Sequence, residues 1–148
     1  MNYEQKILEA EDRIAIRELV DNYAFCADTR DAQGQMALFT EDTNFEVFYD
    51  PKSGISSQVI NSRADLFPVF DNLNTYMTTM HFNGQNSVKL SGNNATGVVY
   101  CIAHHLTIED GKQKLMVAAI KYHDTYIKQN ENWLFAERKL FVDWIENR

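Results

Sequence analysis

The second half of the chain alternates long strand-like segments with short turn-like separators, and this pattern constrains the fold most. The segments cover about residues 76–90, 94–108, 114–128 and 132–144. The separators are rich in Gly, Asn and Asp, as tight turns are: Ser91-Gly92-Asn93-Asn94, Glu109-Asp110-Gly111-Lys112 and Gln129-Asn130-Glu131-Asn132. Because short turns join neighbouring strands antiparallel, we predict a long antiparallel meander.

The first half of the chain has helical periodicity. Residues 4–28 predict a helix whose apolar face recurs at spacings of three and four: Ile16, Leu19, Val20, Tyr23, Ala24 and Ala27. Asp31 is the expected N-cap of a short helix through Met36 and Phe39, and Ser62 of a third helix over residues 63–73. Between them, residues 43–49 alternate as a strand should, with Phe45, Val47 and Tyr49 on one face.

Helices followed by a long sheet indicate an α+β fold. We expect N-terminal helices packed on a strongly curved, mixed but mostly antiparallel sheet, a barrel-like cone that encloses a pocket. The 148 residues have no repeat and no linker, so a single domain over 1–148 is predicted.

Composition narrows the classes of partner. The chain has 14 Lys and Arg against 21 Asp and Glu, a net charge of −7, and no basic cluster, so we expect no nucleic-acid partner. No run of about 18 apolar residues and no signal-peptide pattern occurs, which argues against a membrane span or export. Cys26 and Cys101 are far apart without a CxxC spacing, so we predict reduced thiols and a cytoplasmic location.

Four histidines are candidates for acid–base chemistry: His81, His104, His105 and His123. In the segment 94–108, His104 shares a face with bulky apolar residues, whereas His105 shares the other face with smaller ones such as Val99 and Cys101. We therefore expect His104 to point into the pocket and His105 outward. The alternation around His81 does not decide its direction.

Asp28 is a carboxylate at the edge of an apolar helix face, where burial of its charge is costly unless it is paired. It either makes the turn at the helix end or orients a histidine for general acid–base catalysis. Arg138 lies among apolar residues of the last strand, so it either pairs with a carboxylate or points into the cavity. Tyr23, Tyr49, Tyr100 and Tyr122 could supply hydroxyl groups.

Metal chemistry has little support in the sequence. The adjacent His104 and His105 project to opposite faces of a strand and cannot share a metal. A triad of His81, His104 and Asp28 is conceivable, yet it is no better supported than a metal-free site. We predict no metal and no cofactor.

Two stretches resemble the SnoaL-like family of the nuclear-transport-factor-2-like superfamily, whose fold is a cystatin-like α+β cone. One combines Tyr23-Ala24, Asp28-Thr29-Arg30-Asp31 and Leu38-Phe39-Thr40-Glu41-Asp42; the other is Trp133-Leu134-Phe135-Ala136-Glu137-Arg138-Lys139-Leu140 with Asp143-Trp144. The resemblance covers nearly the whole chain, and its motifs are loose.

Within this superfamily the motifs are most similar to those of scytalone dehydratase and bile-acid 7α-dehydratase. Thr79-Met80-His81-Phe82-Asn83-Gly84 and Ala103-His104-His105-Leu106 resemble the two segments that carry catalytic histidines. Asp28 matches the catalytic aspartate of both, and Tyr23 and Arg138 match a tyrosine and an arginine of the bile-acid enzyme. Ala27 and Tyr122 depart from the scytalone dehydratase pattern, which argues against scytalone as the substrate.

The resemblance implies cofactor-free dehydration, isomerisation or cyclisation of a small hydrophobic carbonyl compound, such as a polyketide, phenol or steroid. His104, oriented by Asp28, would be the general base, while His81 with Tyr23 or Tyr49 would polarise the carbonyl. The expected substrate contacts are Tyr49, Tyr122, Arg138, Phe45 and Met116.

Two other functions remain open: a small-molecule-binding protein without chemistry, and an assembly module similar to the β subunits of aromatic-ring dioxygenases. The outward face of the long strands is predicted to carry Val99, Cys101, Leu115, Val117 and Ala119. Because this face is more apolar than a solvated one, we expect a homodimer through the sheet.

Overall fold

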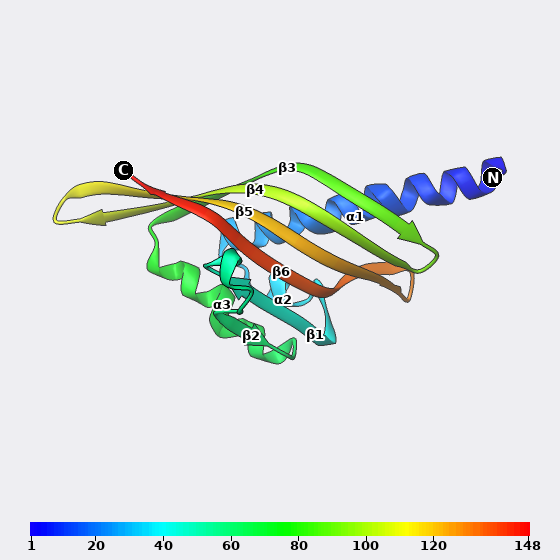
Figure 1. The fold of residues 1–148 in the computed structure, drawn as a ribbon, viewed down its shortest axis with the longest axis horizontal. Helices are drawn as coiled ribbons and strands as arrows, with labels where there is room; N and C mark the ends of the chain where they lie inside the picture. The colour runs from blue at the N-terminus through cyan, green and yellow to red at the C-terminus, as the bar shows by residue number, and fades with distance from the viewer.

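The computed structural model describes residues 1–148 as helices packed on one open, six-stranded mixed sheet (Figure 1). The helices are α1 (Tyr3–Thr29), α2 (Ala32–Met36) and α3 (Phe67–Asp71), with 3-10 turns at Pro51–Ser53, Ala64–Leu66 and Asn72–Thr75. The strands are β1 (Phe39–Phe48), β2 (Gln58–Ile60), β3 (Thr78–Ser91), β4 (Asn94–Glu109), β5 (Lys112–Gln129) and β6 (Asn132–Asn147). Their order in the sheet is β2-β1-β6-β5-β4-β3, and only β1 and β6 pair in parallel.

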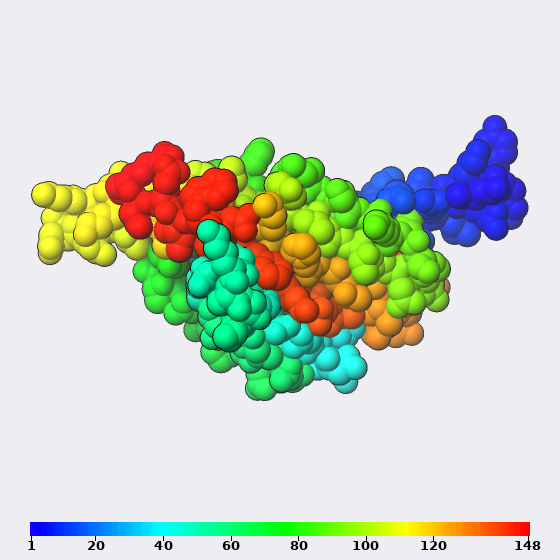
Figure 2. Space-filling model, in the orientation of Figure 1, coloured from blue at the N-terminus to red at the C-terminus, as the bar shows by residue number.

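The long helix α1 begins and ends at side-chain and backbone caps. Asn2 and Gln5 form a reciprocal capping box at its start, and Arg30 closes its end in a left-handed conformation with φ 61°. Its first turns project beyond the sheet, while the tip of the β4–β5 hairpin projects from the opposite end (Figure 2). None of the helices is both long and apolar enough to cross a membrane.

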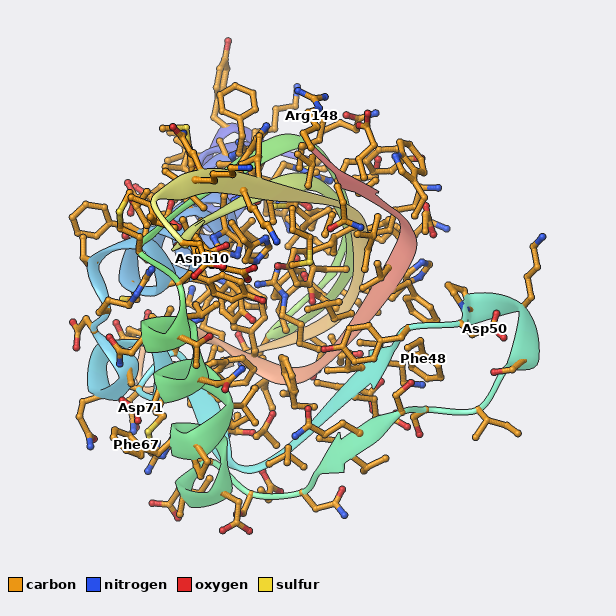
Figure 3. The ribbon with its side chains drawn as sticks, turned by 90° about the vertical axis from the view of Figure 1, so that its left-hand side faces the viewer. Phe48, Asp50, Phe67, Asp71, Asp110 and Arg148 are labelled. Carbon is orange, nitrogen blue, oxygen red and sulfur yellow. The ribbon has the colours of Figure 1, made fainter.

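The sheet curls around an aromatic interior (Figure 3). Phe39 lies at its centre, with ring centroids 5.0 Å from Phe135 and 5.8 Å from Phe70. The ring of Tyr23, on α1, contacts the same cluster edge-on. These rings form the core of the cone, and α3 and the β1–β2 hairpin lie along one side of its open end (Figure 3).

The structure confirms the predicted architecture and the three turns of the meander, and it corrects details of the first half. The expected third helix over 63–73 is one short α-helix between two 3-10 turns. β1 starts at Phe39, earlier than the predicted strand, and the three-residue strand β2 was not predicted.

The predicted orientation of β4 is wrong. The inner, buried residues are the small ones, including Val99, Cys101 and Ala103, whereas Tyr100 and Ile102 lie on the outer face and are about half exposed. Val99 and Cys101 therefore do not contribute to the outward apolar surface as expected. Leu115, Val117 and Ala119 do lie on that outer face, because they pair across from outward-facing β4 positions such as His104 and Ile102.

Candidate functional site

A pocket of about 610 Å³ opens at the wide end of the cone. Seventeen of its 24 lining residues are hydrophobic, and the lining as a whole draws on all three helices and all six strands. The expected pocket residues Tyr23, Phe45, Tyr49, Met116 and Tyr122 all line it. Tyr49 lies at the rim, with 63% of its surface exposed.

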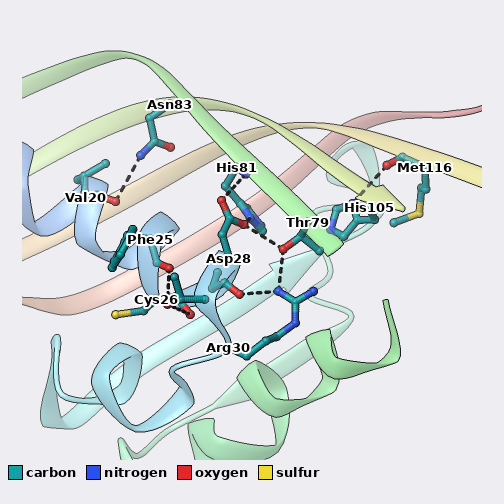
Figure 4. A network of polar contacts seen from close by, with 12 residues as sticks. Val20, Phe25, Cys26, Asp28, Arg30, Thr79, His81, Asn83, His105 and Met116 are labelled. Atoms are coloured by element: carbon teal, nitrogen blue, oxygen red, sulfur yellow. Dashed lines mark hydrogen bonds and ion pairs between the residues drawn. The ribbon is translucent and has the colours of Figure 1, made fainter. Parts of the chain in front are cut away.

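Asp28 and His81 form a hydrogen-bonded dyad (Figure 4), and its histidine lines this pocket. His81 Nδ1 lies 2.7 Å from Asp28 Oδ1, and the His81 side chain is only 8% exposed. α1 delivers Asp28 in its last turn, and β3 delivers His81 from its inner face. Because Nδ1 is bonded to the carboxylate, Nε2 is the ring nitrogen left for a substrate.

Three donors hold the Asp28 carboxylate. Oδ1 accepts from the Thr79 hydroxyl at 2.9 Å as well as from His81, and Oδ2 accepts from the His81 backbone N–H at 2.9 Å. Burial alone would raise the pKa of Asp28, but the hydrogen bonds from His81 and Thr79 outweigh it and lower that pKa below its ordinary value. The carboxylate is therefore ionised and fixed in orientation, as the orienting acid of a histidine base requires.

His105, not His104, is the second histidine of the pocket. His105 is 8% exposed and lines the cavity, and its ring centroid lies 5.8 Å from that of His81. Its Nδ1 lies 3.3 Å from the Met116 carbonyl oxygen. Burial and the neighbouring His81 lower the pKa of His105, which favours the neutral ring.

The expectation that His104 points into the pocket is wrong, because β4 presents the opposite face. His104 pairs with Met80 and Val117 on the outer side of the sheet. It does not contact Asp28, whose histidine partner is His81. For the same reason the His81, His104 and Asp28 side chains cannot form the metal triad considered above, and no other group of three such ligands is present.

Two buried tyrosines and a glutamine form a polar end of the pocket. Tyr23, Tyr122 and Gln35 line the cavity and are at most 5% exposed. Burial raises the pKa of Tyr23 to about 12, and it raises the pKa of Tyr122 well above its ordinary value. Both hydroxyls therefore keep their protons and can donate hydrogen bonds to a substrate oxygen.

Arg138 does not line the pocket as expected of a substrate contact. Its guanidinium is fully buried beneath the tyrosines, 3.6 Å from the ring centroid of Tyr122 and 4.2 Å from that of Tyr23. Its Nε donates to Asp124 Oδ1 at 2.9 Å, so of the two alternatives left open by the sequence the structure shows the ion pair.

Sequence reasoning missed three residues of the site: Thr79, Gln35 and Arg30. The direction of Thr79 could have been found from its spacing of two from His81, since both then share a face of β3. Arg30 lies in the turn that ends α1, and Gln35 lies in α2 directly after it. The sequence pattern does not specify the geometry of this turn.

Comparison with known proteins identifies the family and the fold. The model of the SnoaL-like domain matches residues 8–139. The chain belongs to the SnoaL-like family. An uncharacterized protein of Mycobacterium tuberculosis (strain H37Rv) is 24% identical over 132 residues, 89% of this chain and 86% of the relative.

Similar solved structures extend the likeness to proteins with assigned activities. A provisionally assigned scytalone dehydratase of Novosphingobium aromaticivorans superposes with a TM-score of 0.80, 20% identity, and coverage of 95% of this chain and 89% of that chain. A hexachlorocyclohexane dehydrochlorinase gives 0.80 at 14% identity, over 97% and 93%. An NTF2-like protein with a cystatin-like fold from N. aromaticivorans gives 0.75 at 22%, over 96% and 88%. At these identities the likeness establishes a shared fold.

Proposed function

We propose that this SnoaL-like protein is a cofactor-free acid–base enzyme that eliminates water from, isomerises or cyclises a small carbonyl compound. The observation that carries the proposal is the Asp28–His81 dyad, with its 2.7 Å contact, whose histidine lines an apolar pocket. A histidine oriented by an ionised carboxylate is a general base. This assignment replaces His104, the base expected from the sequence, with His81.

In the proposed reaction, His81 Nε2 removes a proton from the carbon next to the carbonyl. The developing enolate oxygen lies at the polar end of the pocket and accepts hydrogen bonds from Tyr23 and Tyr122, which keep their protons. The resulting imidazolium then returns its proton to a leaving β-hydroxyl, which departs as water, or to another carbon of the conjugated system. The proton count balances within the site without any cofactor.

The lining of the pocket favours an uncharged substrate. No Lys or Arg lines it, and Asp65 is its only lining carboxylate. The cation buried behind the pocket tyrosines, Arg138, is already neutralised by Asp124. A substrate carboxylate or phosphate would lose its hydration without gaining a partner, which is costly. A planar, mostly apolar molecule with one or two oxygens fits the aromatic and aliphatic walls best.

The experiment is a thermal-shift screen of neutral hydroxy-ketones, phenols and enones, followed by mass spectrometry for loss of one water or an isomeric product. Asp28→Asn and His81→Gln should each reduce turnover by about 10²–10⁴-fold, whereas His104→Gln, on the outer face, should not change it. Unchanged turnover in Asp28→Asn or His81→Gln would overturn the proposal. Ligand binding without turnover in the native protein would favour the non-catalytic binding function instead.

We further propose that the outer face of the sheet pairs with a second copy of the chain. Its exposed apolar residues are Met80, Phe82, Tyr100, Ile102 and Trp144. Phe82, Tyr100, Ile102 and Trp144 lie around the Lys121–Asp143 ion pair, at 2.8 Å, so a two-fold axis close to this pair would set each cation near the partner's anion. Sedimentation should show a dimer that Trp144→Glu dissociates. A monomer at micromolar concentration would exclude this pairing and favour an assembly role with a different protein.

The expected cytoplasmic location stays a prediction. It is consistent with the two cysteines, Cys26 and Cys101, which are both free thiols.

A further inference from the structure

Arg30 occupies an unusual backbone position beside the dyad. It follows the last residue of α1 with φ 61° and ψ 35°, a left-handed conformation that a residue with a side chain adopts at a cost and that Gly ordinarily fills at helix ends. This turn sends its guanidinium back toward the sheet, where Nη1 donates to the Ala27 carbonyl at 2.7 Å and to the Thr79 hydroxyl oxygen at 2.8 Å. Figure 4 shows the resulting chain of contacts from Arg30 through Thr79 to Asp28.

The contacts of Thr79 fix the direction of its single hydroxyl proton. A guanidinium can only donate, so the Thr79 oxygen is the acceptor in its contact with Arg30. The hydroxyl hydrogen is then directed to the other neighbour, Asp28 Oδ1, at 2.9 Å. Arg30 therefore holds the Thr79 oxygen in the place from which its hydrogen is donated to the carboxylate.

We propose that Arg30 is a positioning residue, which acts through the Thr79 hydroxyl to hold Asp28 ionised and aligned with His81. Arg30 has no hydrogen bond of its own to Asp28, so its effect passes through Thr79. A catalytic role for Arg30 rests on the proposed function, whereas its effect on the Asp28 carboxylate does not.

A purely structural tether would be redundant at this helix. Arg17, also on α1, already bonds to β3 through the Gly84 carbonyl at 2.8 Å, and Arg13 does so through the Val88 carbonyl at 3.0 Å. Neither residue approaches Asp28. Arg17 therefore provides a matched control, because it joins the same helix to the same strand without contact with the dyad.

The decisive measurement is a ¹³C NMR titration of the Asp28 carboxyl carbon in the protein without ligand. Thr79→Val and Arg30→Asn should each move the titration midpoint upward, while Thr79→Ser, which keeps the hydroxyl, should retain the native midpoint. Asn is chosen because it tolerates the left-handed conformation. Arg17→Met should lower the melting temperature and leave the midpoint in place.

The results test the action of Arg30 through Thr79 separately from the proposed function. An unchanged midpoint in Arg30→Asn overturns the inference, even if Thr79→Val moves it and Asp28→Asn abolishes turnover. If Asp28→Asn leaves turnover unchanged, the proposed function fails. An upward shift of the Asp28 titration midpoint in Arg30→Asn would still support the action of Arg30 through Thr79. With a substrate in hand, Arg30→Asn should lower kcat about tenfold without raising KM, because it alters the base and not the binding surface.

Discussion

Removal of the Arg138 guanidinium should destabilise the fold without acting on ligand contacts. Arg138 and Asp124 both have side chains with no exposed surface, joined by the 2.9 Å contact between Nε and Oδ1. Tyr126 also donates its hydroxyl to Asp124 Oδ2 at 2.8 Å. Arg138→Met keeps most of the aliphatic stem but leaves the Asp124 charge buried with only the Tyr126 hydroxyl as partner.

The size of the expected destabilisation follows from the loss of the only cation paired with Asp124. A buried ion pair that loses one partner typically costs about 3–5 kcal/mol, because the remaining charge keeps its desolvation penalty. The stacking of the guanidinium over Tyr122 and Tyr23 is lost in the same substitution. For a chain of this size each kcal/mol lowers the melting temperature by about 2–4 °C, so we expect a fall of roughly 6–20 °C.

The assay is a double-mutant cycle measured by urea unfolding. Arg138→Met and Asp124→Asn should each be strongly destabilised, whereas the double variant, which buries neither charge, should be more stable than the sum of the two losses predicts. Strict additivity would refute the reasoning. So would a loss of ligand affinity at unchanged stability in Arg138→Met, since that result would place Arg138 among the substrate contacts as the sequence suggested.

Two further predictions use the same unfolding assay. Burial lowers the pKa of His105, so the unfolded chain binds this proton more readily than the native state. The native state should therefore lose stability as the pH falls below about 6.5. His105→Gln should flatten that decline between about pH 7 and 5, and a stability curve parallel to that of the native protein would contradict the prediction. A Cβ at Gly34 would collide with the Asp31 carboxylate that caps α2, so Gly34→Ala should lower the free energy of unfolding by about 1 kcal/mol. Asp31→Ala removes the same cap, so the double variant should lose less than the sum of the two single losses. Full additivity of the two losses would show that the cap is not the cause.

The elements with strong local signals were predictable from the sequence. The bounds of α1 differ from the predicted helix by one residue at each end, since Asn2 and Gln5 cap its start and Asp28-Thr29-Arg30-Asp31 ends its periodicity. The three turns of the meander were found because they concentrate residues that accept positive φ, such as Gly111 at φ 72° and Asn130 at φ 49°. By contrast, β2 has only three residues and pairs at the edge of the sheet, so its existence depends on its partner β1 and not on its own pattern.

Of the two residues of the dyad, Asp28 was predictable from the sequence and its histidine partner was not. Asp28 could be recognised because a carboxylate on an apolar helix ridge needs a partner, whichever partner that is. The identity of the partner depends on which strand passes over the end of α1, and this strand is β3, whose inner face carries Thr79 and His81. Helix and strand are separated by about 50 residues in the chain, and nothing local to either segment encodes their contact.

The inner face of β4 carries its smaller residues, so the bulk of the residues around His104 predicts the wrong face and the wrong histidine. In a sheet that curls strongly, the concave side has less area than the convex side, so it accommodates small residues. The inner face of β4 runs Ala95, Gly97, Val99, Cys101, Ala103 and His105. At Gly97 a Cβ would lie 3.0 Å from the Tyr126 ring, so even one methyl group would require the neighbouring atoms to shift. His105, the first large side chain after these small residues, is the one β4 residue that lines the pocket, with its ring centroid 5.8 Å from that of His81.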